Sequence, residues 1–527
     1  MLKMLMGYEA PVIDYPFAPS DVAMYHAAVS GPDSLDDHTW RDLLLERYAE
    51  RLGRDTSIFG RQMLHGRLRG AAASAESIAR VRLLVDDGAT RERLHQACGG
   101  LRAADADVAG LLFGEGPPPS PRWSRCLALL PLVFLASLAG AFFWAPGWIV
   151  AVALWLALMA MQTAYYQRAQ DWERLVTALQ QQLRVHSLVG ALPADAAVDA
   201  CVAALRPDAS LAGKASRKLG RSPLARAMPG VKEYNDWIWL SNIRHYYASR
   251  DAFLALRGFL RGSYLLVANL EADIALARHL GQAPRFCWAG LGESGDCGES
   301  AESGGDGAIA LDGVVHPLLD EATPLTLELR GRGAFISGQN GVGKSTLLRT
   351  IGLNLVTARA FGFCYADAAS VPPLPVYSSM QSEDSLAGGE SLYIAELRRA
   401  RELLALAAKG PALFIIDEIF RGTNHLESVS AAAAVLDTLA RSGTVLVSSH
   451  NLVLAPLLEH ALAPLCVGEE GGRLRVRPGV LARTNGIALL AERGFGPAIE
   501  SKALSVHNWL SDYLAHPSEC GHVLSEV

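Results

Sequence analysis

Charged residues are scarce in this chain, and neither sign dominates. They make up 19% of the 527 residues, with 48 basic and 54 acidic side chains and a net charge of -6. This composition excludes a protein that binds polyanions mainly through its overall charge, although a local basic patch is still allowed. The hydrophobic fraction of 50% and the mean hydropathy of +0.18 argue against a disordered chain and indicate some membrane content.

Closely spaced cysteine pairs are also missing. The eight cysteines are scattered between positions 98 and 520, and none forms a Cys-x-x-Cys motif. This usage is typical of a reducing compartment rather than of a disulfide framework. Residues 1–17 contain no apolar run long enough for the core of a signal peptide. The length predicts three or four domains at about 150 residues each.

The longest stretch without charge lies between Arg125 and Arg168 and contains 42 residues. A single helix of that length would measure about 63 Å, twice the ~30 Å hydrocarbon core of a bilayer. The sequence Ala145-Pro146-Gly147 divides the stretch into two runs of 19 residues each, 126–144 and 148–166. Each run would span about 28 Å as a helix. We therefore expect a transmembrane helical hairpin over residues 121–168.

Aromatic and basic residues mark the ends of these two runs. The aromatic residues are Trp123, Trp144, Trp148, Tyr165 and Tyr166, and the basic ones are Arg122, Arg125 and Arg168. Membrane interfaces favour aromatic side chains, and flanking positive charges stay on the cytoplasmic side, so both chain termini are expected in the cytoplasm. The competing interpretation is a buried helical hairpin within a large soluble core.

A phosphate-binding loop is indicated at residues 338–346. The sequence Gly338-Gln339-Asn340-Gly341-Val342-Gly343-Lys344-Ser345-Thr346 matches G-x-x-x-x-G-K-[ST] and lies between a predicted strand and a predicted helix. Glycines let main-chain N–H groups surround phosphates, and the new helix adds its positive end. Lys344 is expected to reach the β- and γ-phosphates, and Ser345 to bind Mg²⁺.

Two carboxylates, Asp417 and Glu418, follow the apolar strand predicted at 413–416. Ligands of parallel sheets bind at the carboxyl ends of strands, so Asp417 is expected to hold the Mg²⁺ shell and Glu418 to accept a proton from the attacking water. His450 ends the next strand and is expected to contact the γ-phosphate or orient the water. The alternatives are solvated acids at a strand end and a structural histidine.

The residues between these motifs resemble the MutS mismatch-repair ATPases. Residues 417–424 (DEIFRGTN) are similar to the family's D-E-x-x-R-G-T-[ST/N] segment, and residues 384–391 (DSLAGGES) to its D-D-L-A-S-G-R-S segment. Residues 338–346 resemble its G-P-N-M-G-G-K-S-T loop, with departures at Gln339, Gly341 and Val342. Weaker similarity covers Arg332 with residues 315–319, residues 477–479 and residues 485–488.

The resemblance extends upstream of the apolar hairpin. Residues 56–64 (TSIFGRQML) look like the start of the MutS helical core, and the box at residues 35–40 is similar to membrane-anchored MutS-like proteins of bacteria. The resemblance implies an α/β P-loop ATPase domain of the ABC and MutS type that works as a homodimer. An all-α core and lever region would precede it, interrupted by the two-helix hairpin. It also implies localisation in a bacterial inner membrane with the ATPase domain in the cytoplasm.

The resemblance assigns roles to further residues. Ser391 would complete the nucleotide site of the partner protomer, although an ordinary helix N-cap is the alternative. Asn340 would lie near the phosphates, and Arg421, Gly422 and Thr423 would link the acidic pair to the dimer interface. The expected nucleotide-binding residues are Gly338, Gln339, Asn340, Gly341, Val342, Gly343, Lys344, Ser345, Thr346 and Ser391; the catalytic ones are Glu418, His450 and Lys344; the metal ligands are Ser345 and Asp417.

The expected division of the chain follows from these segments. It comprises an N-terminal segment (1–35), a helical core-like region (36–120), the transmembrane hairpin (121–168), a helical lever-like region (169–290), a loop rich in glycine, serine and acids (291–307), the ATPase domain (308–510) and a tail (511–527). A basic cluster at residues 214–226 either contacts a polyanion or is a solvated loop.

The leading hypothesis is a membrane-anchored MutS-like ATPase that uses ATP and Mg²⁺ to close a dimer and move helical arms. Only about 35 residues precede the core-like segment, so mismatch reading is not expected, whereas DNA as a partner stays open. The alternatives are a DNA-binding protein tethered to the membrane, a nucleotide-switched scaffold for a protein client, and a transporter ATPase.

Overall fold

The protein is described from a computed structural model, in which contacts divide the chain into two compact units. The first unit comprises residues 1–30, 52–66 and 79–282, and the second comprises residues 31–51, 67–78 and 283–527. The structure describes residues 17–30, 35–70, 72–144, 146–221, 231–290, 308–380, 392–421, 424–470, 473–482, 486–487 and 495–513.

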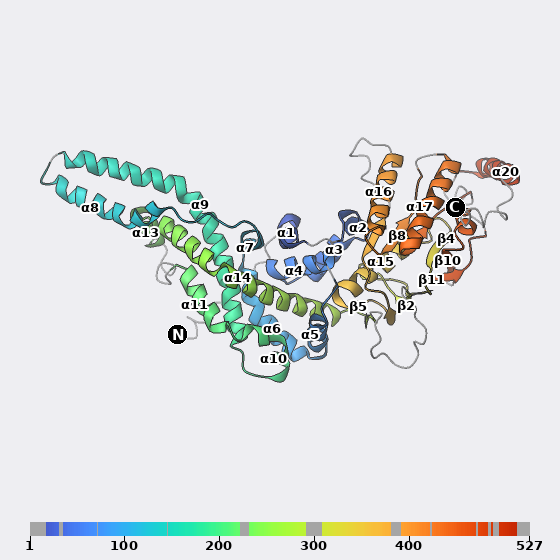
Figure 1. Ribbon diagram of the computed structural model, residues 1–527, viewed down its shortest axis with the longest axis horizontal. Coiled ribbons are helices and arrows are strands. Elements are labelled where there is room, and N and C mark those ends of the chain that lie inside the picture. Colours follow the sequence, from blue (N-terminus) through green and yellow to red (C-terminus); the bar gives the residue numbers. More distant parts are fainter. Residues whose placement is uncertain are drawn as a thin grey trace. The chain divides into compact units, whose positions relative to one another are not determined.

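The first unit is helical, as the sequence predicts. Its helices, in whole or in most of their length, are α1 (Pro19–Val29), α4 (Ile58–Arg69), α5 (Ala75–Asp86), α6 (Gly88–Cys98), α7 (Ala109–Phe113), α8 (Leu129–Ala141), α9 (Gly147–Gly190), α10 (Ala196–Val202), α11 (Ala209–Leu219), α13 (Val231–Ile238) and α14 (Ser241–Leu280). Helices α9 and α14 lie against each other (Figure 1), joined by buried hydrogen bonds such as Trp172 Nε1 to Ser249 Oγ at 2.8 Å.

The two apolar runs differ in how far their helices extend. The first forms a short 3₁₀ segment, Arg122–Ala128, followed by α8, whereas α9 continues for 44 residues, far beyond Tyr166. A helix of that length is about 66 Å long, so roughly half of it would lie outside a ~30 Å hydrocarbon core. The combined helical span Arg122–Ala141 and helix α9 are each long and apolar enough to cross a membrane, and only 17% and 22% of their apolar windows is buried.

Aromatic contacts lie at both ends of this hairpin, where α8 and α9 run side by side (Figure 1). Near its base the Trp123 ring lies 6.3 Å from Tyr165 and 5.4 Å from Tyr247 of α14. At its tip Phe142 and Trp148 are 5.7 Å apart, and both are exposed. The apolar section is thus bounded by aromatic side chains at both ends, the arrangement that membrane interfaces favour.

The second unit is the α/β part of the chain. A six-stranded sheet has the order β11-β10-β4-β9-β8-β7, in which all neighbours are parallel except the β10–β11 hairpin. Its strands are β4 (Gly333–Gly338), β7 (Val376–Ser379), β8 (Leu413–Asp417), β9 (Thr444–Ser448), β10 (Leu462–Glu470) and β11 (Arg473–Pro478). Strands β4 and β8 are buried at every position, which explains their unbroken apolar sequences.

Smaller elements complete this unit. Strands β2 (Ile309–Val314), β3 (Leu325–Leu329) and β6 (Ala368–Ser370) form an antiparallel sheet, and β1 (Cys287–Trp288) pairs with β5 (Phe363–Cys364). The helices are α15 (Lys344–Phe361), α16 (Leu392–Ala407), α17 (His425–Ser442), α18 (Leu454–Leu457) and α20 (Pro497–Tyr513). Strands alternating with helices bear out the α/β prediction for residues after 308.

Residues 35–51, here called the strap, pack on the α/β unit, although the sequence analysis placed them in a helical region over 36–120. The strap contains α2 (Asp37–Asp42) and α3 (Leu45–Leu52). The Asp36 side chain caps α2 by accepting the N–H of Thr39 at 2.7 Å. Leu43, Leu45 and Tyr48 are fully buried. These apolar side chains attach the strap to the α/β unit.

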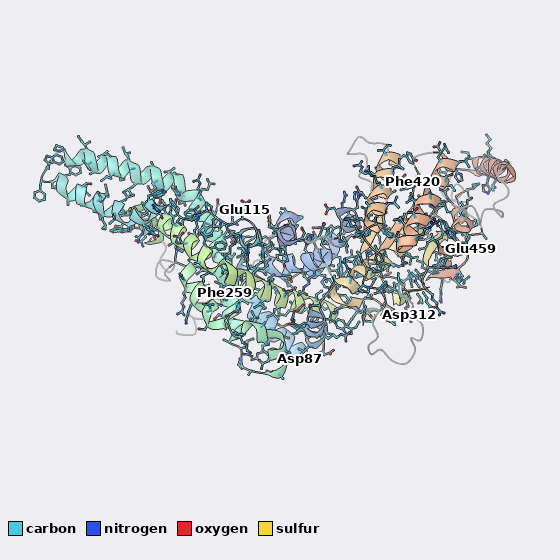
Figure 2. The ribbon with its side chains drawn as sticks, in the orientation of Figure 1. Asp87, Glu115, Phe259, Asp312, Phe420 and Glu459 are labelled. Carbon is cyan, nitrogen blue, oxygen red and sulfur yellow. The ribbon has the colours of Figure 1, made fainter. Side chains whose placement is uncertain are left out.

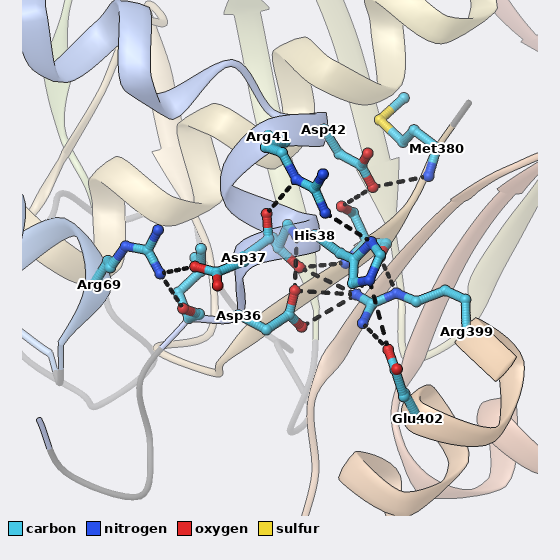
Figure 3. Close-up of polar contacts among 12 residues, drawn as sticks. Asp36, Asp37, His38, Arg41, Asp42, Arg69, Met380, Arg399 and Glu402 are labelled. Atoms are coloured by element: carbon cyan, nitrogen blue, oxygen red, sulfur yellow. Dashed lines mark hydrogen bonds and ion pairs between the residues drawn. The ribbon is translucent and has the colours of Figure 1, made fainter. Parts of the chain in front are cut away.

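Buried polar contacts fix the position of the strap (Figure 3). The Asp42 carboxylate accepts the Ser378 hydroxyl at 2.7 Å and the Met380 N–H at 2.9 Å, and its carbonyl accepts Arg349 Nε of α15 at 3.0 Å. Burial raises the pKa of the Asp42 carboxyl. Arg399 of α16 pairs with Asp36 at 3.1 Å. The strap therefore ties together β7, α15 and α16.

We expect Asp42→Ala to lower the free energy of unfolding by about 2–4 kcal/mol, because a buried hydroxyl and a buried N–H lose their acceptor. Asp42→Asn retains an acceptor oxygen and should cost less. The matched control is Asp37→Asn, which alters a surface pair with Arg69 and should change stability by less than about 1 kcal/mol. Urea unfolding measures all three, and equal stability of Asp42→Ala and wild type would contradict this assignment.

Candidate functional site

Three neighbouring parallel strands bring the predicted motifs to one edge of the sheet. Strand β9 lies between β4 and β8, and Ser448 is the register partner of both Ile336 and Asp417. The phosphate loop follows β4, the acidic pair ends β8 and His450 follows β9. Because the carboxyl ends of these strands are aligned, the three motifs share the edge at which parallel sheets bind ligands.

The phosphate loop has the backbone that its glycines predict. Gly341 and Gly343 have φ angles of +79° and +99°, in the left-handed region where a side chain is strained. Gly343 is the N-cap of α15, so Ser345 and Thr346 lie in the first turn, beside the positive end of the helix. Gln339 and Asn340 are exposed on the loop. A loop of exposed main chain at a helix N-terminus is an anion-binding arrangement.

Lys344 is the buried cation of this loop, with 7% of its surface exposed. Its ammonium donates to the carbonyls of Gly338 at 2.9 Å and Gln339 at 3.1 Å. Burial lowers the pKa of Lys344, whereas the carboxylates of Glu418 and Asp417 act in the opposite direction. The ammonium is thus held at the loop by carbonyl oxygens, which a bound phosphate would replace as partners.

Asp417 is buried at the end of β8, where its carboxylate accepts the hydroxyl of Ser448. Ser345 is half-buried at the start of α15. Hydroxyl and carboxylate oxygens are ligands that Mg²⁺ prefers, and this ion takes its remaining ligands from waters and nucleotide phosphates. The donor set therefore fits Mg²⁺ bound together with a nucleotide.

Glu418 sits in a strained turn and contacts the side chains of His450 and Arg421. Its φ angle is +59°, and that of buried Phe420, labelled in Figure 2, is +56°. Such conformations cost about 1–3 kcal/mol each and are concentrated at functional sites. Glu418 Oε1 lies 2.7 Å from His450 Nε2, and Oε2 lies 3.2 Å from Arg421 Nε. The structure thus brings Glu418 and His450 into contact and shows Arg421 as a second partner of Glu418.

Other residues singled out in the sequence lie elsewhere or outside the described residues. Ser391 and the rest of residues 384–391, with Gly422, Thr423, Arg226 and residues 514–527 of the C-terminal tail, fall outside the described part. His316 is buried, and its burial followed by the nearby Arg349 charge lowers its pKa to about 4. In the basic cluster Arg221 is paired with Asp236 at 2.9 Å and Glu173 at 3.3 Å, so at this position the cluster is a structural ion-pair network.

Two residues of this site escaped the sequence analysis as participants. Ser448 was noted only as part of the strand end before His450, and its hydroxyl holds Asp417. Glu396 of α16 accepts the N–H of Arg421 at 2.8 Å. The Ser448 contact was open to inference, because Ser448 ends a strand beside a carboxylate. Nothing local in the sequence relates Glu396 to residues 25 positions away.

Comparison with known proteins agrees with the motifs. Residues 334–465 match the family model of MutS domain V. The chain is 31% identical over 199 residues to the DNA mismatch repair protein MutS of Thermus aquaticus, covering 36% of this chain and 24% of that protein. It is 30% identical over 275 residues to the Thermus thermophilus protein of the same name, covering 48% of this chain and 31% of that one.

A third relative, MutS of Thermotoga petrophila, is 28% identical over 217 residues, covering 38% of this chain and 27% of that protein. The chain thus spans 24% to 31% of the length of these curated relatives. The expected resemblance to MutS is confirmed for the α/β unit, which contains the matched residues 334–465. The α/β unit of this chain is MutS-like, and its residues 334–465 match MutS domain V.

Proposed function

We propose that this protein is a membrane-anchored MutS-like ATPase. The observation that supports hydrolysis most directly is the position of Glu418, next to Asp417 on the strand end that shares a sheet edge with the phosphate loop. A carboxylate placed there accepts the proton of a water that attacks the γ-phosphorus, while the bond to the bridging oxygen breaks.

The remaining residues of the site bind and orient in this proposal. Lys344 and the loop N–H groups hold the β- and γ-phosphates, and Thr346 and Asn340 lie beside them. Ser345 and Asp417 hold Mg²⁺, which supplies positive charge against the phosphate oxygens. His450, 2.7 Å from Glu418, keeps that carboxylate oriented. The family resemblance adds closure of a homodimer in which Ser391 reaches the partner's nucleotide.

Membrane anchoring rests on the hairpin of α8 and α9. Large apolar side chains on it are exposed, among them Ile149 at 74% and Phe143 at 93%. Water-soluble surfaces rarely carry so many, whereas a bilayer covers them. Arg122, Arg125 and Arg168 at its base support the proposal that both termini and the α/β unit are cytoplasmic, at a bacterial inner membrane. Nucleotide-driven closure would then move the helical arms that lead to the membrane.

The relatives' name, DNA mismatch repair protein, makes DNA a candidate partner. The alternative is a nucleotide-switched membrane scaffold that acts on a protein client without DNA. Either partner is compatible with the ATPase site, and hydrolysis measured with and without added DNA distinguishes them.

Steady-state hydrolysis of Mg·ATP by detergent-purified protein, beside Glu418→Gln, tests the proposal. We expect the variant to lose about 10²–10⁴-fold in kcat, the range for removal of a general base, while binding ATP as tightly as wild type. Glu459→Gln, an exposed carboxylate in the same unit (Figure 2), should leave kcat unchanged. Equal rates for wild type and Glu418→Gln would refute the ATPase, and stimulation by added DNA would favour the DNA partner over the protein client.

A further inference from the structure

The guanidinium of Arg421 lies between two carboxylates. Its Nε is 3.2 Å from Glu418 Oε2 and 3.6 Å from Glu396 Oε1. Glu418 and Glu396 are mostly buried, with 15% and 14% of their side chains exposed. Arg421 therefore bridges the proposed base at the end of β8 to a carboxylate on α16.

Glu396 holds Arg421 through the main chain as well. Its Oε2 accepts the Arg421 N–H at 2.8 Å. Its Oε1 is buried and has no hydrogen-bond partner among the described residues. This oxygen can therefore accept a hydrogen bond from the Arg421 guanidinium. A buried carboxylate oxygen without a hydrogen bond is unfavourable, and Arg421 is the cation close enough to satisfy it.

The turn that carries Glu418 depends on few anchors. Two of its non-glycine residues, Glu418 and Phe420, have left-handed φ angles, which are unfavourable for side chains. The Glu418 N–H donates to Ser448 O at 2.9 Å, the Phe420 carbonyl accepts the Ser428 hydroxyl, and the Arg421 N–H donates to Glu396. Glu396 is the anchor among these that comes from α16.

Both oxygens of Glu418 are engaged in this arrangement, Oε1 by His450 and Oε2 by Arg421. A carboxylate that takes a proton from water needs one oxygen open to that water. Glu396 offers Arg421 a second carboxylate, so the guanidinium can leave Oε2 without losing its charge partner. A shift of α16 toward or away from the turn would change how the Arg421 guanidinium is shared between Glu396 and Glu418.

We propose that Glu396 is a positioning residue for hydrolysis, which acts through Arg421 by drawing its guanidinium from Glu418 and opening that carboxylate to the attacking water. This role rests on the ATPase activity proposed above. It also connects α16 to the base.

The test is a double-mutant cycle on kcat with Glu396→Gln and Arg421→Gln. Removing the charge of Glu396 leaves Arg421 fixed on Glu418, so kcat should fall about tenfold while the Kd for ATP changes less than twofold. In the Arg421→Gln background the same substitution should change kcat less than twofold, because no guanidinium remains to be shared. Glu402→Gln is the control, since Glu402 lies on the same helix but pairs with Arg399 at 3.0 Å.

The other outcomes of the double-mutant cycle contradict either the positioning role of Glu396 or the underlying ATPase. An unchanged kcat in Glu396→Gln overturns the inference, as does an equal fall in both Arg421 backgrounds. Glu396→Asp, which keeps the charge, is measured beside it, and a kcat that follows the melting temperature across both variants also overturns the positioning role. Absence of hydrolysis in wild type above Glu418→Gln instead refutes the underlying ATPase, which separates the two failures.

Discussion

Lys344→Met is expected to weaken ATP binding by about 100-fold or more and to abolish measurable hydrolysis. The ammonium makes charge-assisted bonds worth about 1.5–3 kcal/mol each, and phosphate contacts at two positions would be lost together. Methionine has a similar length, so it fills the buried space that Lys344 occupies. The folded unit should therefore persist, with the carbonyls of Gly338 and Gln339 losing their present donor.

Equilibrium titration with a fluorescent ATP analogue and steady-state hydrolysis measure this effect. The control is Lys409→Met, because Lys409 is an exposed lysine of the same unit. Affinity should be unchanged in the control. Tight nucleotide binding by Lys344→Met would contradict the assignment of residues 338–346 as the phosphate site.

The second large effect concerns the hairpin. Val133 of α8 and Leu156 of α9 are 50% and 56% exposed and lie near the middle of the two apolar runs. A lysine at the centre of a membrane helix costs about 2.5–3.5 kcal/mol. The double variant Val133→Lys, Leu156→Lys should therefore shift insertion by more than about 1,000-fold, since each 1.4 kcal/mol is tenfold.

Carbonate extraction of membranes measures the shift. Wild type should remain in the pellet, and the double lysine variant should move to the supernatant. Leu188→Lys is the matched control, because Leu188 is 55% exposed on the same helix but beyond the apolar run. A wild-type protein that is released by carbonate would favour the buried or partner-covered hairpin over the transmembrane one.

Contacts between distant residues were not predictable from the sequence. The strap reaches the α/β unit through Asp36 and Arg399, which are 363 positions apart, and no local pattern relates them. Helix α9 extends to Gly190. The charged residues after Arg168 favour water rather than lipid around this part of the helix, but they do not interrupt its helical backbone. The apolar pattern predicts an end of the second run at residue 166, where hydropathy changes but the helical geometry does not.

The sequence by itself determined the phosphate loop, the acidic pair and the membrane-compatible hairpin, because each depends on neighbouring residues: strand, glycine turn and helix for the loop, and an uninterrupted apolar run for the hairpin. The tertiary structure decided which unit the strap joins and which side chains surround Glu418. His450 and Glu396 come from two other segments. His450 contacts that carboxylate directly, and Glu396 reaches it through Arg421, which lies three residues from Glu418 on the same turn. Their meeting depends on sheet order and helix placement, which arise from packing over the whole unit.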